Sequence, residues 1–120
     1  QQYDTIDFST QKEPYIEDAC IARLNELNAY LTSRGAYMVV AGYPIANGEF
    51  TPLVSVYEEF QAELEEKLDC PVISYFPEYM FDYQYFYDTL YHLTDEGVQM
   101  RTAILAEDLQ LWLERRDAEV

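Results

Sequence analysis

Three stretches of the chain repeat apolar residues every three or four positions, the spacing of a helix with one buried face. They span residues 15–33, 51–68 and 94–113. Gly35 follows the first stretch, where helices commonly end, and Thr51-Pro52 precedes the second as an N-cap and a first-turn proline. Thr94 is a suitable N-cap for the third. The sequence therefore predicts three amphipathic helices.

The apolar positions of these stretches define the faces that we expect to be buried. They are Ile16, Cys20, Leu24, Leu27 and Leu31 in the first stretch, Leu53, Val56, Tyr57, Phe60, Leu64 and Leu68 in the second, and Val98, Thr102, Leu105, Leu109, Trp112 and Leu113 in the third. In the second stretch, glutamates occupy the opposite face.

Two short apolar runs, 36–40 and 71–76, lie between the helical stretches and are typical of strands covered on both faces. The loops 42–48 and 77–93 follow them. Alternating helices and strands are typical of βαβ units around a parallel sheet. We therefore predict an α/β fold, a three-layer sandwich of the flavodoxin-like type. Two strands are too few for a stable sheet of this kind, so more strands are expected.

The first fourteen residues are polar and irregular and are interpreted as a lead-in segment, with 15–120 as part of a single domain. The sequence starts with Gln1 instead of Met, which we interpret as a sign of an excised or processed piece. The expectation is that these residues form the C-terminal portion of a larger domain. A missing N-terminal portion, or another chain, would then complete the sheet.

The composition and net charge argue against several classes of function. The 120 residues are 49% hydrophobic, which suits one packed domain, and the net charge is −16, with 23 acidic residues against 7 basic ones. Such a charge repels phosphate backbones and anionic membranes, so nucleic-acid binding and membrane contact are disfavoured. The charge otherwise favours solubility. No loop carries a calcium-ligand pattern, and neither a metal nor an organic cofactor is expected.

The two cysteines, Cys20 and Cys70, are expected to be small buried hydrophobic residues. Their separation neither establishes nor excludes a disulfide.

In a parallel sheet, ligands bind beyond the carboxyl ends of the strands, which here lead into the loops 42–48 and 77–93. The second loop contains His92, the only histidine, with Asp88 four residues before it. A position just before a helix disfavours a protonated imidazole and keeps it able to accept a proton. Asp88 would orient the ring if the loop bends back. A structural histidine that caps its loop is the alternative.

The same loop region is rich in aromatic residues. They are Phe76, Tyr79, Phe81, Tyr83, Tyr85, Phe86, Tyr87 and Tyr91. One interpretation is an apolar lid over the edge of the sheet, and the other is a platform on which a sugar ring stacks. In the second case Tyr87 and Tyr91 would bind substrate. Asn47 would add a polar contact, unless it is only a turn residue before Gly48.

The string YFYDTLYHLTDEG over residues 85–97, followed by Arg101-Thr102 and Glu107-Asp108-Leu109, resembles the last conserved block of bacterial SGNH/GDSL hydrolase-like proteins. The stretch 35–47 resembles the penultimate strand of that family with its proline-containing loop, and the likeness spans roughly residues 15 to 115. It implies an Asp and a His that serve a serine nucleophile placed after the first strand. It also implies O-acyl ester substrates, on carbohydrate or cell-envelope material, and an extracytoplasmic place in a bacterium.

The sequence departs from the family pattern in two respects. Three residues, instead of two, separate Asp88 from His92, and no Gly-Asp-Ser or Gly-x-Asn-Asp element is present. None of the four serines is expected on a strand-to-helix turn: they are Ser9, Ser33, Ser55 and Ser74. A Cys70–His92 dyad is rejected, because the two residues flank opposite ends of a strand. Two hypotheses follow: a serine esterase or acyl-transfer enzyme whose serine comes from elsewhere, and a non-catalytic α/β binding or accessory module.

Overall fold

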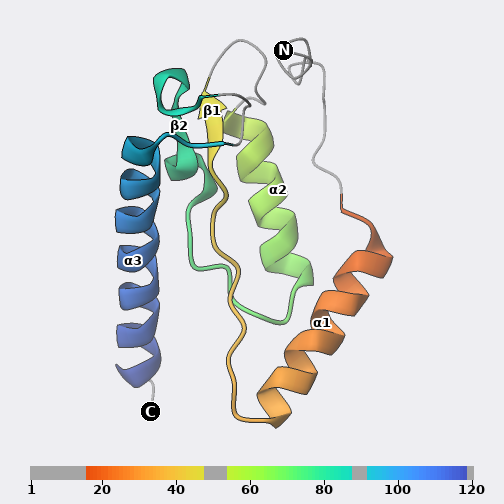
Figure 1. Cartoon of the computed structure of the whole chain (residues 1–120). Helices are drawn as coiled ribbons and strands as arrows, with labels where there is room; N and C mark the ends of the chain where they lie inside the picture. The colour runs from red at the N-terminus through yellow and green to blue at the C-terminus, as the bar shows by residue number, and fades with distance from the viewer. Residues whose placement is uncertain (1–15, 48–53, 88–91, 119–120) are drawn as a thin grey trace.

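The computed structural model describes residues 16–47, 54–87 and 92–118. In this part of the chain three α-helices accompany a two-stranded parallel sheet (Figure 1). The elements are α1 (Asp18–Ser33), β1 (Ile45–Asn47), α2 (Val54–Lys67), β2 (Met80–Asp82) and α3 (Asp95–Ala118), with short 3-10 helices at Phe76–Tyr79 and Tyr83–Tyr85. The prediction of a mixed α/β chain with parallel strands is confirmed at this level.

The paired strands lie in segments that the sequence assigned to loops. β1 runs parallel to β2, with Ile45 opposite Met80, and the predicted strands 36–40 and 71–76 contribute a single parallel bridge between Val40 and Val72. Five positions lead from Val40 to Ile45, whereas eight lead from Val72 to Met80. The 3-10 helix Phe76–Tyr79 accommodates the longer path. The apolar runs thus predicted where the chain is extended, but the residues that form the sheet lie in the segments that follow them.

Helices cover the strands from two sides: in Figure 1, α2 lies on one side of the strands and α3 on the other. A first buried cluster joins α1 and α2 to the segment after α2, and consists of Ile21, Leu64, Leu68, Cys70 and Phe76. A second cluster consists of Ala46, Phe81 and Phe86, packed against Leu93, Met100 and Ile104. Ala46 and Phe81 are register partners and therefore point to the same face of the sheet, the one that α3 covers.

The buried face of α1 matches the predicted one only in part, since Ile16 and Leu24 pack against the first cluster. Ile21 is buried, whereas Cys20 is exposed and Leu27 is 46% exposed. The reason is Asn25, whose side chain donates a hydrogen bond to the Lys67 carbonyl (3.1 Å) and accepts one from the Asp69 amide (2.8 Å). This polar residue faces the end of α2, so the helix is rotated relative to its apolar stripe.

The two cysteines are free and differ in environment. Cys20 is exposed, which corrects the prediction, and Cys70 is buried as predicted. Burial raises the pKa of the Cys70 thiol.

The predicted face of α2 is confirmed by the burial of Leu64 and Leu68, but α3 is again rotated. Val98 and Leu113, both on the predicted stripe, are 48% and 42% exposed. The residues turned inward include Gly97 and Asp108, which an apolar pattern does not count. A Cβ at Gly97 would lie 2.7 Å from the Tyr85 carbonyl oxygen, so the close approach of α3 requires glycine there.

The predicted N-cap of α3 is confirmed, since the Thr94 hydroxyl oxygen accepts a hydrogen bond from the Gly97 amide (3.2 Å). Thr51 and Pro52, the predicted start of α2, lie outside the described residues. Among the described helices, none combines the length and the apolar character that crossing a membrane requires.

Candidate functional site

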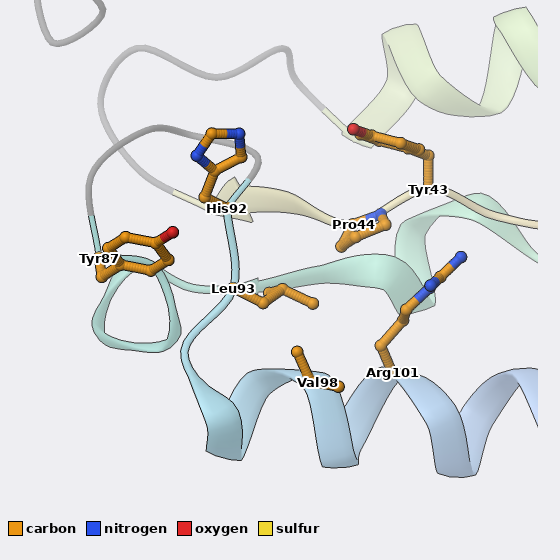
Figure 2. Close-up of a pocket in the computed structure, with 7 residues that line it drawn as sticks. All are labelled: Tyr43, Pro44, Tyr87, His92, Leu93, Val98 and Arg101. Atoms are coloured by element: carbon orange, nitrogen blue, oxygen red, sulfur yellow. The ribbon is translucent and has the colours of Figure 1, made fainter.

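An open pocket of about 350 Å³ lies beside the first turns of α3 (Figure 2). Three parts of the chain form it: the residues just before β1, the segment leading into α3, and α3 itself. The described residues that line it are Tyr43, Pro44, Tyr87, His92, Leu93, Val98 and Arg101. A volume of this size suits a small organic molecule.

Backbone pairing between residues 85–87 and 92–94 fixes the position of His92. The Tyr87 amide donates to the His92 carbonyl (3.1 Å), and the Thr94 amide donates to the Tyr85 carbonyl (2.7 Å). Phe86 and Leu93 form an antiparallel bridge between these two bonds. The imidazole is therefore held directly ahead of the α3 N-terminus by main-chain contacts.

Aromatic and apolar side chains shape the pocket around this histidine. The rings of Tyr87 and His92 lie 6.0 Å apart between centroids, and Tyr87 is 70% exposed. In Figure 2, Leu93 and Val98 lie on the α3 side of the pocket, with His92 and Tyr43 across from them. The pocket thus combines an apolar floor with two exposed phenols and one imidazole.

Arg101 is the permanently charged residue among the described residues that line this pocket. It is half-buried on α3, and its Nε atom is the buried side-chain polar atom that lacks a hydrogen-bond partner in the described part of the chain. The ion pairs between described residues involve Lys67 and Arg116 instead. A desolvated guanidinium nitrogen without an acceptor is energetically unfavourable.

The residues that the sequence singled out divide into three groups. His92 and Tyr87 both line the pocket. Asn47 pairs through its backbone with Asp82 in the β1–β2 ladder. Asp88 and Tyr91 lie outside the described residues, so the proposed Asp88–His92 contact and the substrate-binding role of Tyr91 stay predictions.

Sequence reasoning missed five of the described lining residues: the apolar Leu93 and Val98, and also Tyr43, Pro44 and Arg101. Tyr43-Pro44 belongs to the first predicted loop, which was expected at the same edge as His92, and this was an available signal. Arg101 lies nine positions after His92, within the block that carries the resemblance. Its placement in the pocket follows from two turns of α3 and was not evident from the pattern.

A second polar centre lies farther along α3, in the interior. A carboxylate oxygen of Asp108 accepts hydrogen bonds from the hydroxyls of Ser74 and Tyr79, both at 2.7 Å. Tyr79 has no exposed surface, and its burial, together with the hydrogen bond to Asp108, raises its pKa to about 12. This network joins α3 to the segment before β2 and is satisfied within the protein.

The described residues offer no ready nucleophile to His92. Ser33 and Ser55 are exposed on α1 and α2, and Ser74 is buried with its hydroxyl on Asp108. Neither these serines nor the two cysteines line the pocket, and Ser9 lies outside the described residues. No group of three or more His, Cys, Asp or Glu side chains gathers into a metal site in the part of the chain that the structure describes.

The comparisons with known proteins give no match: no family model, no curated protein and no solved structure is significantly similar to this chain.

Proposed function

We propose that this chain supplies the catalytic histidine of an SGNH-type serine esterase or acyl-transfer enzyme. The observation that carries the proposal is the position of His92: an exposed imidazole on the wall of an open pocket, held immediately before the last helix. The resemblance of residues 85–97 to the last block of that family places a histidine at the same point. The serine nucleophile would come from outside the described residues.

In this reaction His92 takes the proton from the serine hydroxyl as the oxygen attacks the ester carbonyl, and then gives it to the departing alcohol. The acyl group passes to the serine and then to water or to an acceptor alcohol. Asp88 would accept a hydrogen bond from the other ring nitrogen and stabilise the imidazolium. No metal or organic cofactor is required for this chemistry.

O-acyl esters on carbohydrate or cell-envelope material are the proposed substrates. The exposed rings of Tyr43 and Tyr87 on the pocket wall support this class, since sugars stack on aromatic faces. Asn47 and Tyr91 are proposed as further contacts. The proposal also includes the larger architecture: a three-layer sandwich, whose remaining strands come from another part of the protein or from a second chain, in an extracytoplasmic bacterial setting.

The decisive test is acetate release from acetylated xylose by the complete protein, with His92→Ala compared against the wild type. We expect a loss of roughly 10²–10⁴-fold in kcat, the usual contribution of general acid–base catalysis. Gln99→Ala, an exposed change on the same helix outside the pocket, is the matched control and should leave the rate unchanged. A His92→Ala rate equal to that of the wild type would contradict the proposal.

A non-catalytic α/β binding or accessory module is the second candidate. It is favoured by one observation, the lack of a described serine or cysteine on the pocket wall. A fluorophosphonate probe, which labels activated serines, distinguishes the two when it is applied to the complete protein. Labelling that disappears in His92→Ala supports the enzyme, whereas ligand binding without labelling or turnover supports the module.

A further inference from the structure

The arginines of this protein differ in how their charge is accommodated. The guanidinium of Arg34 stacks on the ring of Tyr30 at 4.6 Å, and that of Arg116 lies over the rings of Tyr37 (4.5 Å) and Trp112 (5.5 Å). These aromatic contacts stabilise the charge within the protein. Arg101 lines the pocket with its Nε buried and without an acceptor.

The surroundings of Arg101 have an unusual charge for this chain. Acidic residues outnumber basic ones by 23 to 7 overall, yet none of the described residues that line the pocket is a carboxylate. Among the described lining residues, Arg101 is the one that carries a permanent positive charge. The pocket therefore offers a local site for negative charge on a protein whose net charge is −16.

We infer that the pocket binds a small ligand by an anionic oxygen group, a carboxylate or a phosphate, held by the Arg101 guanidinium. Such a group accepts two parallel N–H hydrogen bonds from an arginine. Because Nε is buried, the terminal nitrogens of the Arg101 guanidinium, which lines the pocket, are the donors. The uncharged part of the ligand, a ring or a short chain, lies over Leu93 and Val98 toward His92 (Figure 2). This arrangement places the charge at one end of the ligand and the reacting bond at the other.

The pocket is the one in which His92 would act, so what the anion site implies about substrates rests on the proposed function. The anion site narrows the proposed substrates to acyl esters that carry a negatively charged group at the end opposite the ester. Binding itself requires no turnover, so it is measured separately.

Matched probes test the inference. Benzoate and phenyl phosphate are titrated into the complete protein and followed by ligand-observed NMR, with benzamide and phenol as their uncharged counterparts. The anions should bind at least about tenfold more tightly than the neutral probes, as expected for hydrogen bonds to a charged group. Equal affinity of both anions and their neutral counterparts, or no binding of either anion, would overturn the inference.

The variants isolate Arg101. Arg101→Gln should reduce the affinity for the anions by roughly tenfold or more and leave that for benzamide unchanged. Arg115→Gln removes the same charge from the same helix, at an exposed position that does not line this pocket, and should have little effect. Equal losses in both variants would reveal a long-range charge effect and contradict the inference. Circular dichroism checks folding, and Arg101→Lys, which keeps the charge, should retain part of the preference.

The ester 4-acetoxybenzoate and its amide 4-acetoxybenzamide separate this inference from the proposed function. One result is a preference for benzoate that depends on Arg101, together with hydrolysis that does not depend on His92. It would support the anion site and refute the esterase. The opposite result is hydrolysis that depends on His92 but proceeds at equal rates for the two esters and is unaffected by Arg101→Gln. It would support the esterase and refute the anion site.

Discussion

Two charged residues of α3, Arg101 and Asp108, lie two helical turns apart and face the same side of the helix. Asp108 accepts hydrogen bonds from two buried hydroxyls, those of Ser74 and Tyr79. Arg101 is half-buried as well, but its Nε atom has no acceptor. The contrast separates a polar group whose hydrogen bonding is completed by the fold from one whose hydrogen bonding the described part of the fold leaves incomplete.

The difference follows from what each residue faces. Asp108 lies against the segment before β2, where the Ser74 backbone is also held by the Gln61 side chain (2.7 Å). Arg101 faces the residues before β1 and the residues leading into α3, which leave an open volume. We therefore expect the Asp108 network to determine stability and the Arg101 pocket to determine function.

The largest expected effect comes from Tyr79→Ala, which removes a completely buried ring from the Asp108 network. The free energy of unfolding should fall by about 3–5 kcal/mol, the usual cost of truncating a buried aromatic residue. Urea unfolding of the complete protein measures it, with the exposed Tyr75→Ala as a control that should change far less. Similar losses in the two variants would mean that Tyr79 is not the centre of this network.

Asp108→Ala comes next, because it leaves the hydroxyls of Ser74 and Tyr79 without their acceptor. We expect a loss of about 1–3 kcal/mol, the penalty of an unsatisfied buried polar group. Glu107→Ala, at the exposed neighbouring position, should be close to neutral. In Asp108→Ala, the free energy of benzoate binding should change less than the free energy of unfolding. A larger change in binding would show that the two centres are coupled and that they do not serve separate roles.

The pH dependence gives a smaller effect. The pKa of Tyr79 is raised from its usual 10 to about 12 in the folded protein, so its stabilising contribution is complete below pH 10 and is lost as the pH rises toward 12. By pH 11 this loss should reach about 1 kcal/mol. Denaturant unfolding at pH 9 and pH 11 should show a steeper decline in the wild type than in Tyr79→Phe, and parallel declines would refute the assignment.

The smallest effect on stability is expected for Arg101→Met. Replacing an unsatisfied guanidinium by an apolar side chain of similar length should change the free energy of unfolding by no more than about 0.5–1 kcal/mol, in either direction. Benzoate binding should nevertheless be lost. A destabilisation as large as that of Asp108→Ala would show that Arg101 serves the fold, and the distinction between the two centres would disappear.

Much of the local structure could be predicted from the sequence. The existence of three helices, the Thr94 cap, the inner face of α2 and the parallel direction of the strands all follow from periodicity and capping chemistry. Where the prediction was wrong, polar or small residues face neighbouring segments: Asn25 of α1 binds the end of α2, and Gly97 and Asp108 of α3 turn inward. An apolar pattern does not register such residues, because their burial depends on partners from other segments.

The candidate site divides in the same way. His92 could be identified from the sequence, because its uniqueness, its place before a helix and the resemblance of its block are all local features. Arg101 could not, because its role depends on how far α3 carries it toward Tyr43 and Pro44, and those residues come from a distant part of the chain.

By itself, the sequence determined the acidic composition, the existence of the three helices and the place of the candidate residue His92 just before the last of them. These features depend on residues close together along the chain. The tertiary structure alone decided which residues pair in the sheet, which faces of α1 and α3 are buried, and which charged side chain lacks a partner. Each of these depends on groups far apart in the sequence, as in the Asp108 network, where Ser74 lies 34 positions from its acceptor. Hydrogen bonding in the interior requires such partners, and only the folded chain brings them together.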